Sequence, residues 1–225
     1  MLQQKILCVM ILMASLGAEE AWKSKRAADW TDQETKQVLT DSPWAAMVTP
    51  TIKKIERQPA NRGVNVGIPG MGRRRMGGQP QDSSDRGNES SSDTAVPLNV
   101  RWESALPVRE AELKARETNA PAVDEDHYAI AVYGIPNRYA KDPQSLADHL
   151  KGQSTIKREG QKDLKPTHVD VLQRDDGLVI VFLFPRTNEI TAKDSRVEFN
   201  ATIGPFQIAQ AFHVDEMIYQ GKMEL

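Results

Sequence analysis

Seven consecutive apolar residues, Leu178 to Phe184, constrain the fold of this chain more than any other feature. They follow Asp176-Gly177, and an Asp-Gly pair between two apolar runs is a strong signal for a β-hairpin. The run before the turn contains Val169 and Val171. A strand with no polar position is buried on both faces, so we expect Leu178 to Phe184 at the centre of a sheet.

Further strands are expected after this hairpin. Val197, Phe199, Ala201 and Ile203 alternate with polar residues, and the alternation resumes at Phe206 after Gly204-Pro205. A last strand is expected around Met217 to Leu225. Short turns between such strands predict an antiparallel meander.

Helices are expected at three places. Thr31 and Glu34 fit a capping box and predict a helix over about 31–40, limited by Pro43. Ser104 is expected to cap a helix whose apolar residues are Val108, Ala111, Leu113 and Ala115, ending near Asn119. Pro143 to Lys151, started by Asp142, is the third.

These elements predict an α+β fold, in which a mostly antiparallel sheet of about six to seven strands has two helices on one face. Trp44 to Ile52 is expected to add a strand, because tryptophans in so polar a region need to be buried. Strands are also expected around Val100 and Trp102 and from Tyr128 to Val132. We place this α+β domain at 97–225, preceded by a helix and strand segment at 19–57.

Residues 58–96 separate these two ordered parts. They hold seven of the fourteen glycines, Arg73-Arg74-Arg75 and serine-rich tracts, and no aromatic residue. Such a composition cannot bury enough apolar surface to offset the entropy of ordering, which predicts a disordered insert.

The first 18 residues have the parts of a secretory signal peptide: Lys5, an apolar run from Ile6 to Leu16, and small residues at Gly17-Ala18. Eleven apolar residues are fewer than the about twenty that span a bilayer, so a permanent anchor is the weaker alternative. Cleavage is expected after Gly17 or Ala18. We therefore expect a periplasmic or secreted protein, whose membrane contact is limited to the uncleaved signal segment.

Cys8 is the only cysteine, and Lys5 stands where a lipobox needs an apolar residue. Removal of residues 1–18 leaves no thiol, which excludes disulfides, thiol catalysis and thiolate metal sites. The net charge of the remaining chain is 28 minus 31, or minus three. A nearly neutral chain has no global field for nucleic acid, and we expect no nucleic-acid partner.

Several short motifs suggest chemistry without establishing it. Ser154-Thr155-Ile156-Lys157 has the Ser-x-x-Lys spacing of penicillin-binding enzymes but not their companion motifs, so we interpret it as a solvated segment after a helix. Gly67 to Gly72 lacks the strand that a dinucleotide loop requires. Arg73 to Arg75 could contact RNA, lipid phosphate or an acidic wall polymer, but as one local patch they do not decide the function.

Histidines and acidic residues leave a second possibility open. His127, His168 and His213 lie on or beside predicted strands and could approach one another, whereas His149 lies apart; no zinc-binding histidine pair is present. Asp124-Glu125-Asp126 could hold a cation or act as an acid and base, although a solvated loop is the favoured interpretation. The sequence indicates no cofactor and no metal.

Three segments of the chain carry a resemblance to other proteins: Leu39 to Ala45, Val100 to Arg109 and Met217 to Leu225. They resemble an uncharacterised family of exported proteins from Acidobacteria-type soil bacteria, which also has a glycine-rich insert. The resemblance implies a periplasmic or secreted location, and it brings no activity, cofactor or functional residue that could be carried over to this chain.

Two functions remain open at this stage. The favoured one is a non-catalytic interaction or structural protein of the bacterial envelope, with an envelope protein or polymer as its partner; an exposed apolar patch around Trp30 or Trp44 would support it. The alternative is a hydrolase whose acid/base or metal site is assembled from distant residues, such as Asp124 to Asp126 with a histidine.

Overall fold

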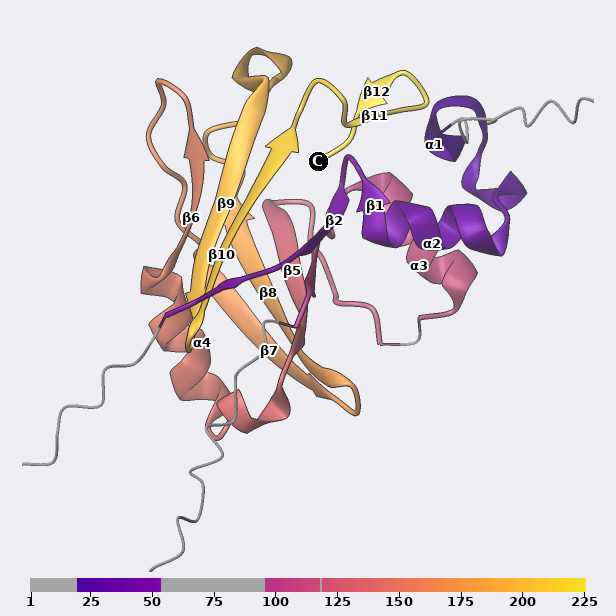
Figure 1. The fold of residues 1–225 in the computed structure, drawn as a ribbon. Helices are drawn as coiled ribbons and strands as arrows, with labels where there is room; N and C mark the ends of the chain where they lie inside the picture. The colour runs from indigo at the N-terminus through magenta and orange to yellow at the C-terminus, as the bar shows by residue number, and fades with distance from the viewer. Residues whose placement is uncertain (1–19, 54–95, 118) are drawn as a thin grey trace, which may run out of the picture.

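The computed structural model describes residues 20–53, 96–117 and 119–225 (Figure 1). The expected signal segment, and the expected insert except for Val96, lie outside these residues. The described chain is an α+β fold with mostly antiparallel sheets, as the sequence predicts.

Four α-helices are described, and two of them match the predicted ones closely. Thr31 and Glu34 form the predicted capping box of α2, because Glu34 N donates to Thr31 Oγ1 at 3.2 Å and Thr31 N donates to Glu34 Oε2 at 2.7 Å. Asp142 caps α4 through Ser145 N. The helices are α1 (Ala21–Ser24), α2 (Asp32–Thr40), α3 (Leu106–Ala115) and α4 (Pro143–Gly152). Short 3-10 turns are η1 (Ala27–Asp29), η2 (Asn137–Tyr139) and η3 (Ala192–Asp194).

The strands divide between two sheets and a small hairpin, whereas the sequence predicts one sheet. The six-stranded sheet has the order β1 (Asp41–Ser42), β2 (Ala45–Val48), β4 (Leu98–Trp102), β5 (His127–Ile135), β8 (Gly177–Pro185), β7 (His168–Arg174). The four-stranded sheet has the order β3 (Thr51–Ile52), β10 (Phe206–His213), β9 (Arg196–Ile203), β6 (Ser154–Arg158). The N-terminal strand segment contributes to both sheets, since β2 pairs with β4 and β3 pairs with β10.

The predicted hairpin at Asp176-Gly177 is confirmed. Strands β7 and β8 pair antiparallel with Arg174 opposite Gly177, and β8 lies inside the sheet between β7 and β5. Gly177 has a φ of +137°, and a Cβ there would lie 2.8 Å from the carbonyl oxygen of Ile135. Glycine is therefore required both for the backbone conformation and for this close approach.

The end of the chain differs from the predicted three-stranded meander. Strands β9 and β10 pair antiparallel as predicted, with Phe206 opposite Ile203. The residues beyond them do not extend this sheet. They form a separate hairpin of β11 (Ile218–Tyr219) and β12 (Lys222–Met223), because the chain turns at Gln220-Gly221 after only two paired residues.

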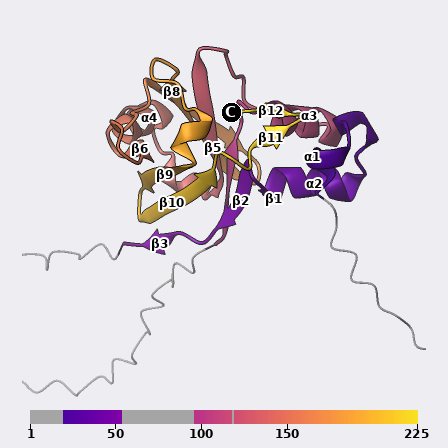
Figure 2. The same ribbon diagram turned by 90° about the horizontal axis from the view of Figure 1, so that it is seen from above.

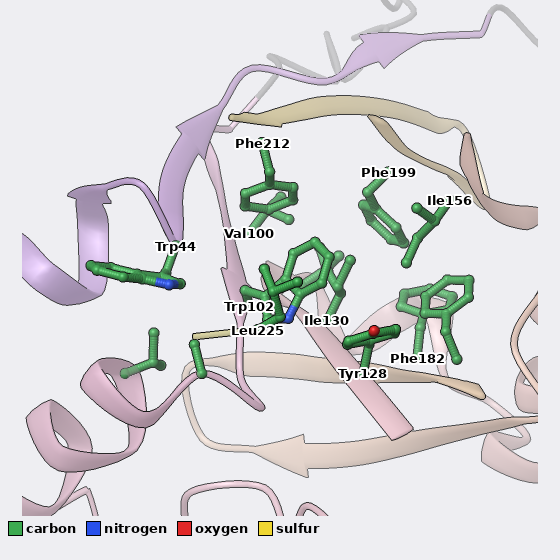
Figure 3. Packing of buried hydrophobic residues seen from close by; sticks show 14 of the residues in the cluster. Trp44, Val100, Trp102, Tyr128, Ile130, Ile156, Phe182, Phe199, Phe212 and Leu225 are labelled. Carbon is green, nitrogen blue, oxygen red and sulfur yellow. The ribbon is translucent and has the colours of Figure 1, made fainter. Parts of the chain in front are cut away.

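The main core lies between the two sheets, where alternate residues of both inner faces meet (Figure 3). Trp102 of β4 is fully buried there and contacts Tyr128 and Phe212, with ring centroids 5.8 Å and 5.2 Å away. Phe182 of β8 packs on Phe199 of β9 at 5.2 Å. Aromatic contacts across the gap therefore join the sheets.

The segment before residue 54 shares this core. Trp22 packs edge-on against Trp44 at 6.1 Å, and the Trp44 indole N–H donates to the carbonyl of Glu224 at 2.7 Å. Trp30 lies against Tyr219 at 5.9 Å. Helices α1 and α2 lie beside the β11–β12 hairpin and α3 in both views (Figures 1 and 2).

Helix α3 differs from its prediction at both ends. It begins at Leu106 with Ala105 as its N-cap, and the Ser104 hydroxyl instead accepts a hydrogen bond from Ala129 N at 3.1 Å. The strand β5 thus uses the serine that we expected to cap the helix. The helix ends at Ala115, because Arg116 adopts the left-handed conformation with a φ of 56°.

Helix α4 lies beside β7 and β9, at the far side of the molecule from α2 and α3 (Figure 1). Within the described residues, no helix has the length and apolarity needed to cross a membrane.

Candidate functional site

A buried group of charged side chains lies on the outer face of the six-stranded sheet. Alternation along β4 points Val100 and Trp102 into the core, which directs Asn99 and Arg101 to the opposite face. Tyr133 of β5 lies opposite Asn99 in the register and shares this face. Glu103 follows β4 and is 1% exposed.

Helix α3 lies beside this face near β4 and adds a further carboxylate. Its buried residues include Val108, Ala111 and Glu112, while Leu113, expected in the apolar face, is 80% exposed. The reason is the helical period: Glu112 is four residues after Val108 and lies on the same face, whereas Leu113 points away. We call Arg101, Glu103, Glu112, Glu117 and Tyr133 the latch cluster.

Arg101 is the centre of the latch cluster. Its guanidinium approaches Glu117 Oε2 at 3.1 Å and Glu112 Oε1 at 3.5 Å, and its Nε donates to the carbonyl of Leu39 at 3.0 Å. It also lies 4.3 Å from the centroid of the Tyr133 ring. One side chain therefore ties β4 to both α2 and α3.

The Tyr133 hydroxyl links the two most deeply buried carboxylates. It donates to Glu103 and lies 3.4 Å from Glu112 Oε1. The other oxygen of Glu103, Oε2, has no hydrogen-bond partner in the described structure. Arg174 of β7 lies 5.2 Å from the Tyr133 ring centroid, so the ring contacts two guanidinium groups.

Burial makes these carboxyls hard to ionise. Burial, followed by the negative charge of Glu103, raises the pKa of Glu112 to about 9. Burial also raises the pKa of Glu103, and Arg101 only partly opposes this effect. The Tyr133 pKa is raised by burial and by Glu103. The cluster therefore holds a proton at neutral pH, which we place on Glu112.

The latch cluster has the chemistry of a buried structural network. Glu103 and Glu112 are 1% and 4% exposed, so a ligand on the surface does not touch them. The contacts of Glu112 with Arg101 and Tyr133 join α3 to the sheet, and the hydrogen bond from Tyr133 to Glu103 joins β5 to the residue that follows β4. These residues are not among the site residues predicted from the sequence, although the sequence holds two signals for them: Glu112 shares the helical face of Val108, and Arg101 alternates with Val100 and Trp102.

A groove lies above the latch cluster, between α2 and the end of α3. Its volume is about 690 Å³. Arg101 and Glu117 form part of its floor. It is lined by Asp32, Thr35, Lys36, Leu39, Thr40, Arg101, Lys114, Ala115, Arg116 and Glu117. We call this cavity the α2–α3 groove.

The structure brings one predicted acid and histidine together. His127 Nδ1 lies 2.8 Å from Asp124 Oδ1, and its Nε2 lies 3.0 Å from the hydroxyl of Thr167. The hydrogen bond to His127 lowers the pKa of Asp124. This is a surface chain of three groups, and the α2–α3 groove is lined by other residues.

The other histidines lie apart. His168 of β7 pairs with Asp170 at 3.0 Å, while His213 lies on β10 of the other sheet. His149 lies on α4. Within residues 20–53, 96–117 and 119–225, no group of three or more histidine, cysteine, aspartate or glutamate residues could hold a metal ion.

One further expectation needs correction. Ser154 to Lys157 is part of strand β6, not a solvated segment, because it pairs with β9; Ser154 is 2% exposed and its hydroxyl donates to the carbonyl of Leu150 at 2.7 Å.

The tryptophans are buried, as expected. Trp30 and Trp44 are 2% and 0% exposed, so they do not form the exposed patch that would have supported a docking role.

Cys8, Gly67 to Gly72 and Arg73 to Arg75 lie outside the described residues. Comparison with protein-family models, with curated proteins and with solved structures gave no match to this chain.

Proposed function

We propose that this chain is an exported, non-catalytic interaction protein of the bacterial envelope. The observation that carries the proposal is the arrangement at the α2–α3 groove. Exposed charged side chains line the groove, while the carboxyls with raised pKa values lie beneath it and hold α3 to the sheet. Such a surface is suited to binding a partner, whereas the buried carboxyls beneath it stabilise the fold.

Export is supported by the sequence. Lys5, the apolar run from Ile6 to Leu16 and the small residues Gly17-Ala18 have the order of a signal peptide. Ala21 and Trp22, only a few residues further on, are buried in the core. Cleavage after Ala18 would remove the apolar run and leave every described residue in place.

The segment between β3 and β4 supplies additional contact residues, including Arg73 to Arg75. It leaves and rejoins the same folded body, since β3 and β4 each pair within the described sheets. We propose that the folded domain docks on the partner while this segment extends the contact.

The test is binding of residues 19–225 to purified envelope fractions, compared with a variant in which a short Gly/Ser linker replaces residues 54–95. Retention of the intact chain by one fraction, weakened in the variant, supports the proposal. If neither protein is retained by any fraction, the interaction function is wrong.

One observation favours a second candidate, a hydrolase. The hydrogen-bonded order Asp124, His127, Thr167 is that of an acid, a base and a hydroxyl nucleophile. A screen of ester, glycoside and peptide substrates with the wild type and His127→Ala tests it. Turnover that disappears in His127→Ala while the fold is retained would establish the hydrolase and overturn the non-catalytic proposal.

A further inference from the structure

The α2–α3 groove has an excess of positive charge. Its cations are Lys36, Arg101, Lys114 and Arg116, and its anions are Asp32 and Glu117. This local balance is opposite to that of the whole chain, whose net charge is minus two.

The four cations are not equally available. Arg101 is neutralised from within by Glu117. Lys114 donates to the carbonyl of Ala28 at 2.6 Å, which holds its ammonium at the groove and leaves it further donors. In the described part of the chain, Lys36 and Arg116 are exposed and have no ion-pair partner.

Arg116 occupies a backbone position where glycine is usual. Its φ of 56° places it in the left-handed region, directly after the last residue of α3. A side chain is unfavourable in this conformation, and glycine would relieve the strain. Arg116 therefore combines a strained backbone with a place on the rim of the cavity, and this combination is one basis of the proposal below.

The end of α3 does not cancel this positive charge. The last carbonyls of a helix carry partial negative charge when they are free. Here the backbone N–H of Arg116 donates to Leu113 at 3.2 Å, and that of Glu117 donates to Glu112 at 3.0 Å. These capped carbonyls leave the cationic side chains as the main charges at the rim.

We propose that the α2–α3 groove binds the anionic groups, carboxylate or phosphate, of an envelope polymer, with Lys36 and Arg116 as its charge contacts and Lys114 as a further hydrogen-bond donor. This inference rests on the proposed interaction function and names its ligand class. Exposed ion pairs are individually weak, so a single free anion binds poorly. A polymer offers many anionic groups to each protein molecule, which raises the overall affinity.

The experiment measures binding of residues 19–225 to polygalacturonate, to inorganic polyphosphate and to neutral dextran at low and moderate salt. We expect binding to at least one anionic polymer, weakened by salt, and none to dextran. Comparison of the two anionic polymers separates carboxylate from phosphate. Equal binding to dextran would overturn the proposal.

A matched pair of variants locates the site. The double variant Lys36→Glu with Arg116→Glu is expected to bind the preferred polymer at least tenfold more weakly. The control, Lys162→Glu with Lys165→Glu, makes the same change in net charge at two exposed lysines outside the groove, and should stay within twofold of the wild type. Equal losses of polymer affinity in the two variants would show that binding depends only on the net charge of the protein.

Arg116→Gly separates binding from folding. Glycine relieves the strained backbone, so we expect the Tm to rise by a few degrees while polymer affinity falls about threefold. Unchanged affinity would show that the Arg116 side chain does not contribute to polymer binding. If envelope fractions retain wild type and Lys36→Glu/Arg116→Glu equally, the groove assignment fails but the interaction function stands. If they retain neither, the function itself fails.

Discussion

The hydroxyl of Tyr133 donates a hydrogen bond to the carboxylate of Glu103, beneath a helix that contributes a second carboxyl, Glu112. Three glutamates and one arginine meet here, so the cluster would be strongly negative if every carboxyl were ionised. It avoids this charge by keeping a proton. The attachment of α3 to the sheet therefore depends on protonation.

This dependence predicts a slope of stability with pH. The pKa of Glu112 is about 9 in the folded chain, above its ordinary value of 4.5, so the folded state binds the proton more tightly. Stability should fall as the pH rises from about 4.5 to about 9, by up to about 1.4 kcal/mol per unit. The free energy of unfolding of Glu112→Gln should change less with pH than that of the wild type, and should be larger at pH 8. Urea unfolding at several pH values measures both.

Glu125→Gln is the control for this series, because Glu125 is exposed and belongs to no described ion pair. Its pH profile should follow that of the wild type. If Glu112→Gln has the same slope as Glu125→Gln, Glu112 does not hold the proton.

Arg101→Met should be strongly destabilising. It leaves Glu117 without its cationic partner, and removing one partner of a buried ion pair costs about 3–5 kcal/mol. Glu112 is already protonated at neutral pH, so the loss caused by Arg101→Met should be similar in the Glu112→Gln background. Equilibrium urea unfolding at pH 7 measures both; a much smaller loss in the Glu112→Gln background would show that Glu112 is ionised beside Arg101.

Much of the fold could be predicted from local patterns. The Asp176-Gly177 turn and the apolar run after it predict the β7–β8 hairpin and its place inside a sheet. Thr31 with Glu34 predicts the start of α2. These features depend on turn chemistry, capping and burial, which are encoded within a few residues.

The division into two sheets and the latch cluster could not be predicted in this way. Nothing in β6 indicates that it pairs with β9 and not with the central strands, since that choice depends on the path of the whole chain. Glu112 was missed because charged residues are assumed to face solvent. Its burial depends on Arg101 and Tyr133, which are distant in sequence and meet it only in the folded state.

Tyr219→Phe tests how the N-terminal segment is held. The Tyr219 hydroxyl accepts from the backbone N–H of Ala27 at 3.1 Å and donates to Glu110 at 2.6 Å, and Tyr219 is 1% exposed. Removing the hydroxyl leaves a buried N–H without a partner, which costs about 1–3 kcal/mol. Tyr139→Phe, at a less buried tyrosine, should change the free energy of unfolding little. Equal effects would mean that the contact to Ala27 is unimportant.

Replacing residues 54–95 with a short linker should leave the fold intact. The linker joins Lys53 to Val96. Val48 of β2 pairs with Leu98 of β4, Lys53 is five residues after Val48, and Val96 is two residues before Leu98. These seven residues span at most about 25 Å, so a Gly/Ser linker of about ten residues, which spans up to about 33 Å, can close the gap. Thermal unfolding should remain cooperative with a Tm within a few degrees of the intact chain. A large drop would show that residues 54–95 stabilise the domain.

The contacts of Trp44 with Glu224 and of Trp30 with Tyr219 also set the order in which the chain can fold. A ribosome makes the tryptophans early and their partners almost two hundred residues later. Until residues 206–224 have been made, Trp30 and Trp44 lack part of their packing and strand β3 lacks β10. Folding is therefore completed only after nearly all of the chain has been synthesised, which suits a protein that we propose crosses a membrane before it folds.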